Sequence, residues 1–292
     1  MNIKTIVRYL YNLLLSKKKY HFVIKEWFSS SDIDLCQKLL ATKRFSETIA
    51  PSLLGFPSGS RILVIAPHPD DEMIGPGGTV LKSIEANKKV KVVYLTKGKA
   101  DNEEVLIQET KLISENYGYE THFMEAEPKK IPTTGDYLSN FSDILNKFQP
   151  DTIFLPFICD DHPDHRMAGY LLYQLKKHEL YSKNPEVWAY QVYSSVFPNV
   201  VVDITDVINK KKNAIDCWHS QSKKRNWSHY ALGLNAYNSR FINSVDRESY
   251  AEHFFVLPLC DYLDLCLPYY KSLYADKDKD KDKDKDKDKA MS

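Results

Sequence analysis

The sequence has almost no excess of charge of either sign. Its 292 residues include 40 lysines and arginines and 39 aspartates and glutamates, so the formal net charge is +1. A nucleic-acid-binding protein usually concentrates a basic excess on one face, and this composition supplies none. We therefore expect a small-molecule partner and no nucleic acid. Apolar residues make up 43% of the chain, enough to bury one full core.

Cysteine is scarce and shows no pairing pattern. The count is odd and no CxxC motif occurs. A disulfide framework is therefore not expected, and reduced thiols fit a cytoplasmic protein. The five cysteines are Cys36, Cys159, Cys217, Cys260 and Cys266.

The sequence also lacks an apolar run long enough to cross a bilayer. Near the N-terminus, Leu10–Leu15 is far shorter than the roughly 20 residues of a transmembrane helix, and no small-residue cleavage site follows. Apolar residues of this segment nevertheless fall at helical spacing, and Lys17–Lys19 follow them. Two interpretations stay open. The helix docks on its own domain, or residues 1–20 form a basic amphipathic helix that touches the inner face of the membrane.

Four segments follow from composition along the chain. We predict a helical N-terminal extension over residues 1–60 that closes in a Pro- and Gly-rich loop, a catalytic-size domain over 61–260 and a C-terminal segment over 261–275. From Asp276, seven aspartates alternate with seven lysines up to Lys289. This stretch has no apolar residue to offset the entropy of ordering, so we expect a disordered tail over 276–292.

Buried-type strands alternate with helices between residues 61 and 220. The run ILVIA at 62–66 is continuously apolar and rich in branched side chains, which is typical of a strand covered on both faces. The alternation predicts an α/β fold, a Rossmann-like three-layer α/β/α sandwich with a mostly parallel sheet. We predict strands at 62–66, 90–96, 121–124, 152–157, 187–193 and 200–204, and helices at 76–86, 102–117, 136–148, 166–178 and 206–220.

Two clusters of histidine and carboxylate residues each follow one of these strands. The first, HPDDE, contains His68, Asp70 and Asp71, and the second, DDHPDH, begins at Asp160 and ends at His165. Ligand sites in open α/β sheets lie beyond the carboxyl ends of the strands, so neighbouring strands would bring both clusters together. Two histidines and one aspartate would then bind a divalent metal and leave a position open for water. Without thiolates, such a site suits Zn²⁺, or Fe²⁺, Mn²⁺ or Co²⁺.

The residues around these clusters resemble a known family. ILVIAPHPDDEMIGPGGTV, at 62–80, resembles the opening motif of the PIG-L/LmbE deacetylases, which act on N-acetylglucosaminyl substrates. HPDHR, at 162–166, is similar to their second motif, and KKNAIDCWHSQ, at 211–221, is similar to a helix that ends in a Ser-Gln pair. The resemblance covers about residues 60–255. It implies an LmbE-like fold and removal of the N-acetyl group from an N-acetylglucosamine-type sugar conjugate.

The resemblance also implies roles, carried over by motif position. Zinc would be bound by His68, Asp71 and His165. Asp70 would be the general base, and His162 would stabilise the oxyanion together with the zinc. Either Asp70 or His162 would protonate the leaving amine. Asp164 would orient a histidine, whereas Glu72 would either support the site or face the substrate.

Two departures from the family limit this transfer. Thr96-Lys97-Gly98-Lys99 lacks an acidic residue that relatives often have after the second strand, so substrate contacts in that loop are not carried over. The extension at 1–60 is longer than in many bacterial members and would partly cover the mouth of the site.

Several alternatives remain at this stage. The same metal chemistry fits a zinc amidase or esterase acting on a non-sugar natural product, and a non-catalytic glycan-binding protein could share the fold. The glycines at 75, 77 and 78 do not match GxGxxG, so dinucleotide binding is not expected. Some aromatic residues would stack on sugar rings or fill the core, namely Trp188–Tyr193, Trp218, Trp227 and Tyr230. Oligomeric state is not predicted.

Overall fold

A computed structural model describes residues 50–98, 103–223 and 225–271. The predictions for the N-terminal helix, its membrane contact and the Asp-Lys tail lie outside these residues. The chain divides into two units, one of residues 40–267 and one of residues 1–39 and 268–292. Of the second unit the structure describes only residues 268–271, which are helical. Among the described residues, no helix is both long and apolar enough to span a bilayer.

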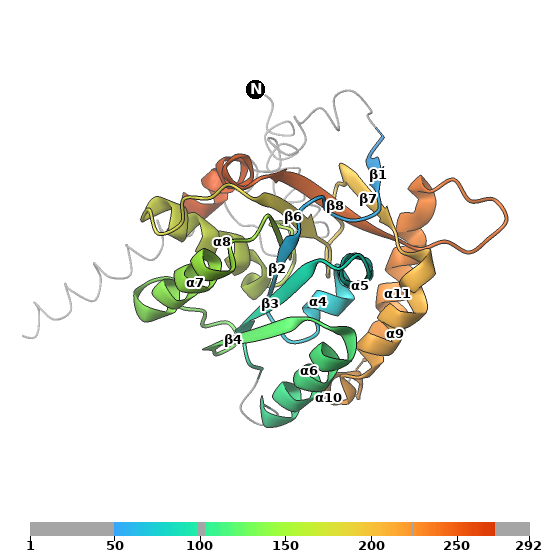
Figure 1. Cartoon of the computed structure of the whole chain (residues 1–292), viewed down its shortest axis with the longest axis horizontal. Coiled ribbons are helices and arrows are strands. Elements are labelled where there is room, and N and C mark those ends of the chain that lie inside the picture. Colours follow the sequence, from blue (N-terminus) through green and yellow to red (C-terminus); the bar gives the residue numbers. More distant parts are fainter. Residues whose placement is uncertain (1–49, 99–102, 224, 272–292) are drawn as a thin grey trace, which may run out of the picture. The chain divides into compact units, whose positions relative to one another are not determined.

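The larger unit is built on one eight-stranded mixed sheet (Figure 1). The strand order is β1-β7-β8-β6-β5-β2-β3-β4, and only β8 runs antiparallel to its neighbours. The predicted α/β fold with a mostly parallel sheet is therefore confirmed. The strands are β1 (Ser52–Leu54), β2 (Arg61–Ala66), β3 (Lys89–Thr96), β4 (Glu120–Ala126), β5 (Thr152–Pro156), β6 (Glu186–Tyr190), β7 (Val200–Asp203) and β8 (Ala251–Pro258).

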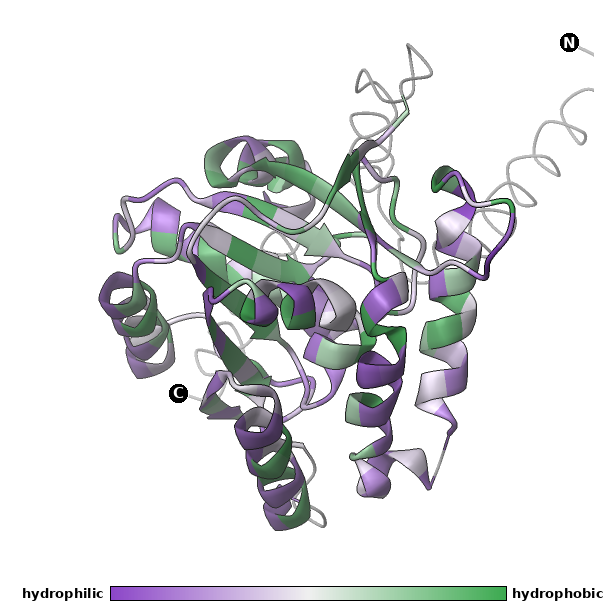
Figure 2. Ribbon diagram, turned by 45° about the vertical axis from the view of Figure 1, so that its right-hand side comes forward, coloured by the Kyte–Doolittle hydropathy of each residue, from purple (hydrophilic) through white to green (hydrophobic). Residues whose placement is uncertain are grey.

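Helices cover both faces of this sheet (Figures 1 and 2). Successive side chains of a strand point to opposite faces. In β2, Ile62 and Val64 pack in the core beneath α5, whereas Leu63 and Ile65 point to the other face, where α7 and α8 lie. All four are fully buried. The helices are α4 (Asp71–Ile74), α5 (Gly77–Glu85), α6 (Glu103–Tyr117), α7 (Gly135–Phe148), α8 (Pro163–Lys177), α9 (Ile208–Asp216), α10 (His219–Ser222) and α11 (Trp227–Asn238), with short 3₁₀ turns η1 (Thr205–Val207) and η2 (Ser239–Phe241).

Several elements differ from the sequence predictions. β1 lies in the segment predicted to be a Pro- and Gly-rich loop, and β8 and α11 were not predicted. The helix predicted at 206–220 is divided into η1, α9 and α10. The division falls at Trp218, whose ψ of 71° leaves the helical region while its indole is buried in the core. Burial of this large aromatic side chain outweighs continuation of the helix.

A buried ion pair joins four of these elements behind the predicted metal motif. Glu252 of β8 accepts hydrogen bonds from the backbone N–H groups of Gly78 (2.6 Å) and Thr79 (2.8 Å), in the first turn of α5. Lys211 of α9 donates to Glu252 at 2.7 Å and to the carbonyl of Gly75 at 3.0 Å. The carboxylate thus accepts N–H groups that have no partner within α5 and lies at the positive end of the helix dipole. The lysine holds the C-terminal end of α4 through the carbonyl of Gly75.

We expect Lys211→Met to destabilise the protein by about 3–5 kcal/mol, because it leaves a buried carboxylate without its cation. The measurement is the midpoint of urea unfolding followed by circular dichroism. Lys212→Met is the matched control, since Lys212 pairs with Asp216 on the surface at 2.6 Å and should contribute less than about 0.5 kcal/mol. Equal shifts for the two variants would contradict the structural role of Lys211.

Candidate metal centre

The two histidine-rich clusters meet at one edge of the sheet. β2 and β5 are adjacent and parallel, with Ile62 opposite Thr152 in the register. Their carboxyl ends therefore point the same way, and the segments that follow them converge. The sequence predicted a shared site if these two strands were neighbours, and in the structure they are.

Three donor atoms converge at the centre of this site. Asp71 Oδ2 lies 3.2 Å from His68 Nδ1 and 3.2 Å from His165 Nε2. Ligands bound at about 2.0–2.1 Å in a tetrahedral arrangement are roughly 3.3 Å apart. The spacing of these atoms therefore fits a Zn²⁺-sized cation.

A carboxylate stands behind each of the two histidines. Asp164 Oδ2 lies 3.0 Å from His68 Nε2, and Asp160 Oδ1 lies 2.9 Å from His165 Nδ1, close in distance although not well aligned with the ring N–H. Such carboxylates keep the proton on the outer nitrogen and leave the inner one free to bind a metal. The inner nitrogen, His165 Nε2, is buried and forms no hydrogen bond with the described residues, so a cation is a suitable partner for it.

The charges of the centre also favour a bound cation. Burial would lower the pKa of His68, but the hydrogen bonds to Asp164 and Asp71 outweigh it and raise that pKa to about 9. In His165 burial is likewise outweighed by Asp71 and Asp160, and the pKa rises to about 10. The carboxylates thus hold positive charge between them. A divalent metal would supply that charge with both rings neutral.

Backbone contacts fix the two outer carboxylates. Asp164 accepts the N–H of Lys129 at 3.0 and 2.9 Å, and Asp160 accepts the N–H groups of His162 and Tyr193, each at 3.0 Å. Each aspartate is therefore held in part from outside the two histidine clusters, Asp164 by Lys129 and Asp160 by Tyr193. The structure places Asp164 beside His68, in the position that a histidine-orienting residue requires.

His162 lies in the same cluster but presents its ring differently. The three histidines 68, 162 and 165 have ring nitrogens within 4.8 Å of one another. His162 caps α8, and its Nδ1 accepts the N–H of Asp164 at 3.2 Å. Burial, then the charges of His68 and His165, lower the pKa of His162 to about 4. A neutral imidazole has one lone pair, which is used here, so Nε2 carries the proton and is a donor.

Asp70 is held in a strained backbone conformation next to Asp71 in the chain. Its φ is 119°, in the region that favours glycine, which costs about 1–3 kcal/mol. Its carbonyl accepts the N–H groups of Met73 and Ile74, and its own N–H donates to Glu72. Burial, followed by repulsion from Asp71, holds the pKa of the Asp70 carboxyl well above its usual range. A raised pKa suits a general base.

Glu72 supports this turn from inside the core. Its carboxylate is fully buried and accepts hydrogen bonds from Tyr94, from Tyr119 (3.1 Å) and from the N–H of Asp70 (3.1 Å). Of the two alternatives left open by the sequence, contact with substrate is therefore wrong. Glu72 holds the strained turn that carries Asp70.

The structure also corrects the aromatic predictions and adds a residue. Trp188 and Trp218 are each 1% exposed, so both belong to the core and cannot stack on a sugar ring. Tyr193 and Tyr230 are exposed by 44% and 59%.

Asp160 received no role from sequence reasoning, although it stands in the second cluster, because the motif does not show which histidine it faces.

We expect Asp160→Asn to weaken metal binding by about 10- to 100-fold, because the neutral amide no longer stabilises the His165 tautomer with a free Nε2. Competition with a chromogenic chelator measures this affinity. Asp161→Asn is the matched control, since Asp161 accepts from Ser194 Oγ at 3.1 Å and faces none of the three histidines. An Asp160→Asn affinity equal to that of the control would contradict the assignment.

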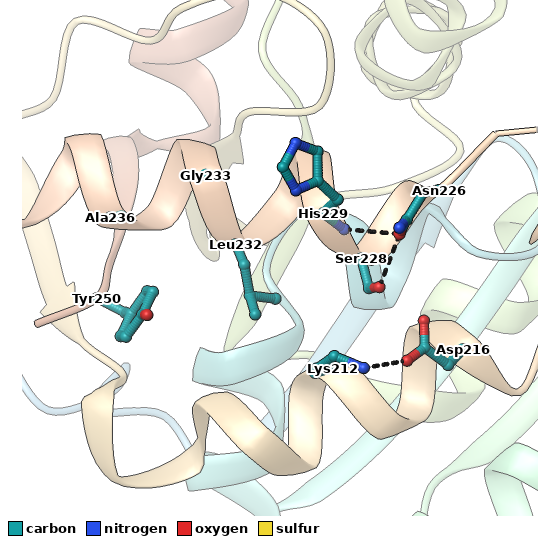
Figure 3. Close-up of a pocket in the computed structure, with 9 residues that line it drawn as sticks. All are labelled: Lys212, Asp216, Asn226, Ser228, His229, Leu232, Gly233, Ala236 and Tyr250. Carbon is teal, nitrogen blue, oxygen red and sulfur yellow. Dashed lines mark hydrogen bonds and ion pairs between the residues drawn. The ribbon is translucent and has the colours of Figure 1, made fainter. Parts of the chain in front are cut away.

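A separate groove of about 420 Å³ lies between α9 and α11 (Figure 3). Several of its polar groups already have partners. Lys212 pairs with Asp216, and Asn226 caps α11 by accepting from Ser228 Oγ and from the N–H of His229. None of the residues predicted for metal binding or catalysis lines this groove, so it is not the chemical centre.

Comparisons with known proteins agree with the geometry. The family profile "GlcNAc-PI de-N-acetylase" (PIG-L) matches residues 63–176, which include both clusters. The chain is 28% identical to diacetylchitobiose deacetylase of Thermococcus kodakarensis, over 57% of this chain and 72% of that protein. Deacetylases acting on N-acetylglucosamine-type substrates are thus among its relatives.

Solved structures share the fold at lower identity. N,N'-diacetylchitobiose deacetylase from Pyrococcus horikoshii superposes with a TM-score of 0.60 and 22% identity, covering 81% of this chain and 96% of that one. The hydratase GalB from Pseudomonas putida KT2440 gives a TM-score of 0.56 and 21% identity, covering 68% and 96%. The fold alone therefore does not determine the reaction. The matched motifs and the sequence relatives support a PIG-L/LmbE-type deacetylase family for this chain, with the profile match spanning residues 63–176.

Proposed function

We propose that this protein is a zinc-dependent N-deacetylase that removes the acetyl group from an N-acetylglucosamine-type sugar conjugate. The observation that carries the proposal is the triad of donor atoms His68 Nδ1, Asp71 Oδ2 and His165 Nε2, with Asp71 Oδ2 3.2 Å from each ring nitrogen. Asp70 and His162 stand beside it. Relatives that deacetylate diacetylchitobiose support the choice of substrate.

His68, Asp71 and His165 would hold the zinc. When bound there, zinc supplies a Lewis acid that polarises the acetyl carbonyl and lowers the pKa of a water molecule to about 7. Asp160 and Asp164, on the outer nitrogens, keep both imidazoles in the binding tautomer.

The chain's own groups move the protons and stabilise the developing charge. Asp70 accepts a proton from the water as its oxygen attacks the acetyl carbon. His162 Nε2–H donates to the carbonyl oxygen as that oxygen becomes negative. The C–N bond then breaks, Asp70 returns the proton to the leaving nitrogen, and acetate and a free amine result.

Metal analysis combined with acetate release tests the proposal. About one zinc per chain, with chelator-sensitive acetate release from N-acetylglucosamine conjugates, would support it. The panel also contains non-sugar amides and esters, scored for any acid released. Release of acid only from these compounds would replace the proposal with the amidase or esterase alternative. A metal-loaded protein that hydrolyses nothing in the panel would contradict both.

A further inference from the structure

A row of aromatic rings leads away from the catalytic histidines. The ring of Tyr193 stacks on His165, with centroids 5.3 Å apart and planes inclined by 14°. Trp227 lies 5.9 Å from Tyr193, and Tyr230 lies 6.3 Å from Trp227. We call Tyr193, Trp227 and Tyr230 the aromatic row.

The aromatic row is fixed at its base and open on its outer side. Trp227 and Tyr230 are three residues apart on α11 and therefore share one face of the helix. Trp227 packs partly against the core, which holds its ring in place. Tyr193 and Tyr230 remain 44% and 59% exposed. Rigid, exposed rings next to a reaction centre need no further ordering to bind a flat apolar surface, such as the C–H face of a pyranose.

A guanidinium completes this surface. The Arg225 side chain is exposed and lies 5.0 Å from the centre of the Trp227 ring and 5.8 Å from that of Tyr230. No carboxylate among the described residues forms an ion pair with it. Stacking on the rings orients the planar group, and its N–H groups stay available for a planar or tetrahedral anion. This positive charge contrasts with the carboxylates that surround the metal centre.

We propose that the aromatic row and Arg225 form a second subsite, which binds the sugar ring attached to the N-acetylated one together with an anionic substituent such as a phosphate. The inference rests on the proposed function and adds a substrate class to it: phosphorylated or otherwise anionic glycoconjugates, at least two rings long. Neutral disaccharides would use the aromatic row alone.

Two matched substrates test the subsite in the zinc-loaded, full-length protein. These are N,N'-diacetylchitobiose and its 1-phosphate. We expect the wild type to prefer the phosphate, and Arg225→Ala to raise KM for the phosphate about tenfold with little effect on the neutral disaccharide. Trp227→Ala should raise KM for both substrates by a similar factor. Added salt should weaken the binding of the phosphorylated disaccharide and leave that of the neutral disaccharide unchanged.

A second Arg–Tyr pair, at the C-terminal end of α11 and in η2, provides the controls. Arg240 lies 4.4 Å over the ring of Tyr237, which is 65% exposed but has no ring contact with the aromatic row. Arg240→Ala and Tyr237→Ala should leave the phosphate preference as in the wild type. A wild type without this preference, or an Arg225→Ala effect no larger than that of Arg240→Ala, would overturn the anionic subsite.

Calorimetry separates this inference from the proposed reaction. The titrant is chitobiose 1-phosphate, which has no acetyl group to lose. Binding that Arg225→Ala weakens about tenfold would support the subsite even if no acetate is released from any substrate, a result that would contradict only the deacetylase. Absence of binding to the wild type, together with active deacetylation of neutral disaccharides, would overturn the subsite alone.

Discussion

We expect Asp70→Asn to lower the rate constant for acetate release by about 10²- to 10⁴-fold, the usual contribution of a general acid–base residue, while the protein keeps its metal. The amide has the shape of the carboxylate but cannot accept a proton at neutral pH. The three donor atoms that converge in the centre belong to other residues, so metal content should stay at the wild-type level. Steady-state kinetics and elemental analysis of the same preparation give both numbers.

Asparagine is the substitution that isolates the chemistry of Asp70. The residue has a φ of 119°, and asparagine tolerates positive φ better than most non-glycine residues. The turn and its hydrogen bond to Glu72 should therefore persist, which unfolding midpoints will check. Loss of metal together with activity, or a fall in kcat smaller than about tenfold, would remove Asp70 from the proton transfer.

The parts of the fold that sequence reasoning predicted are those encoded locally. β2 and β5 are continuous apolar runs, and every residue from Ile62 to Ala66 is buried. Parallel strands buried on both faces leave this signal because neither face can be polar. The metal motifs follow the ends of these strands, so the rule for strand ends also predicted where the site would lie.

β8 could not be predicted in the same way. It inserts antiparallel between β6 and β7, and its start carries the buried polar residues Glu252 and His253. Glu252 is stable there only because Lys211 and the first turn of α5, far away in sequence, supply its partners. Asp160 shows the same limit, since its contact with His165 depends on how the loop turns. Non-local pairing of polar groups leaves no periodic trace in the sequence.

Asp71→Ala and His162→Ser should give opposite metal contents although both lower turnover. Two sets of ligands are compatible with the cluster of side chains: His68, Asp71 and His165, or the three histidines. The hydrogen bond from the N–H of Asp164 to His162 Nδ1 favours the first set, because it occupies the acceptor lone pair of that neutral imidazole. Asp71 Oδ2, by contrast, faces both remaining histidines at 3.2 Å.

With the first set, Asp71→Ala removes a ligand, and we expect the purified protein to contain well below one zinc per chain and to release no acetate above background. His162→Ser removes a donor to the oxyanion, which lowers kcat by about 10²- to 10³-fold while zinc stays at about one per chain. Serine also caps helices well, so α8 keeps its first turn and a loss of stability does not confuse the result. Zinc lost from His162→Ser but retained by Asp71→Ala would show that the three histidines bind the metal, and that the oxyanion is stabilised by another group.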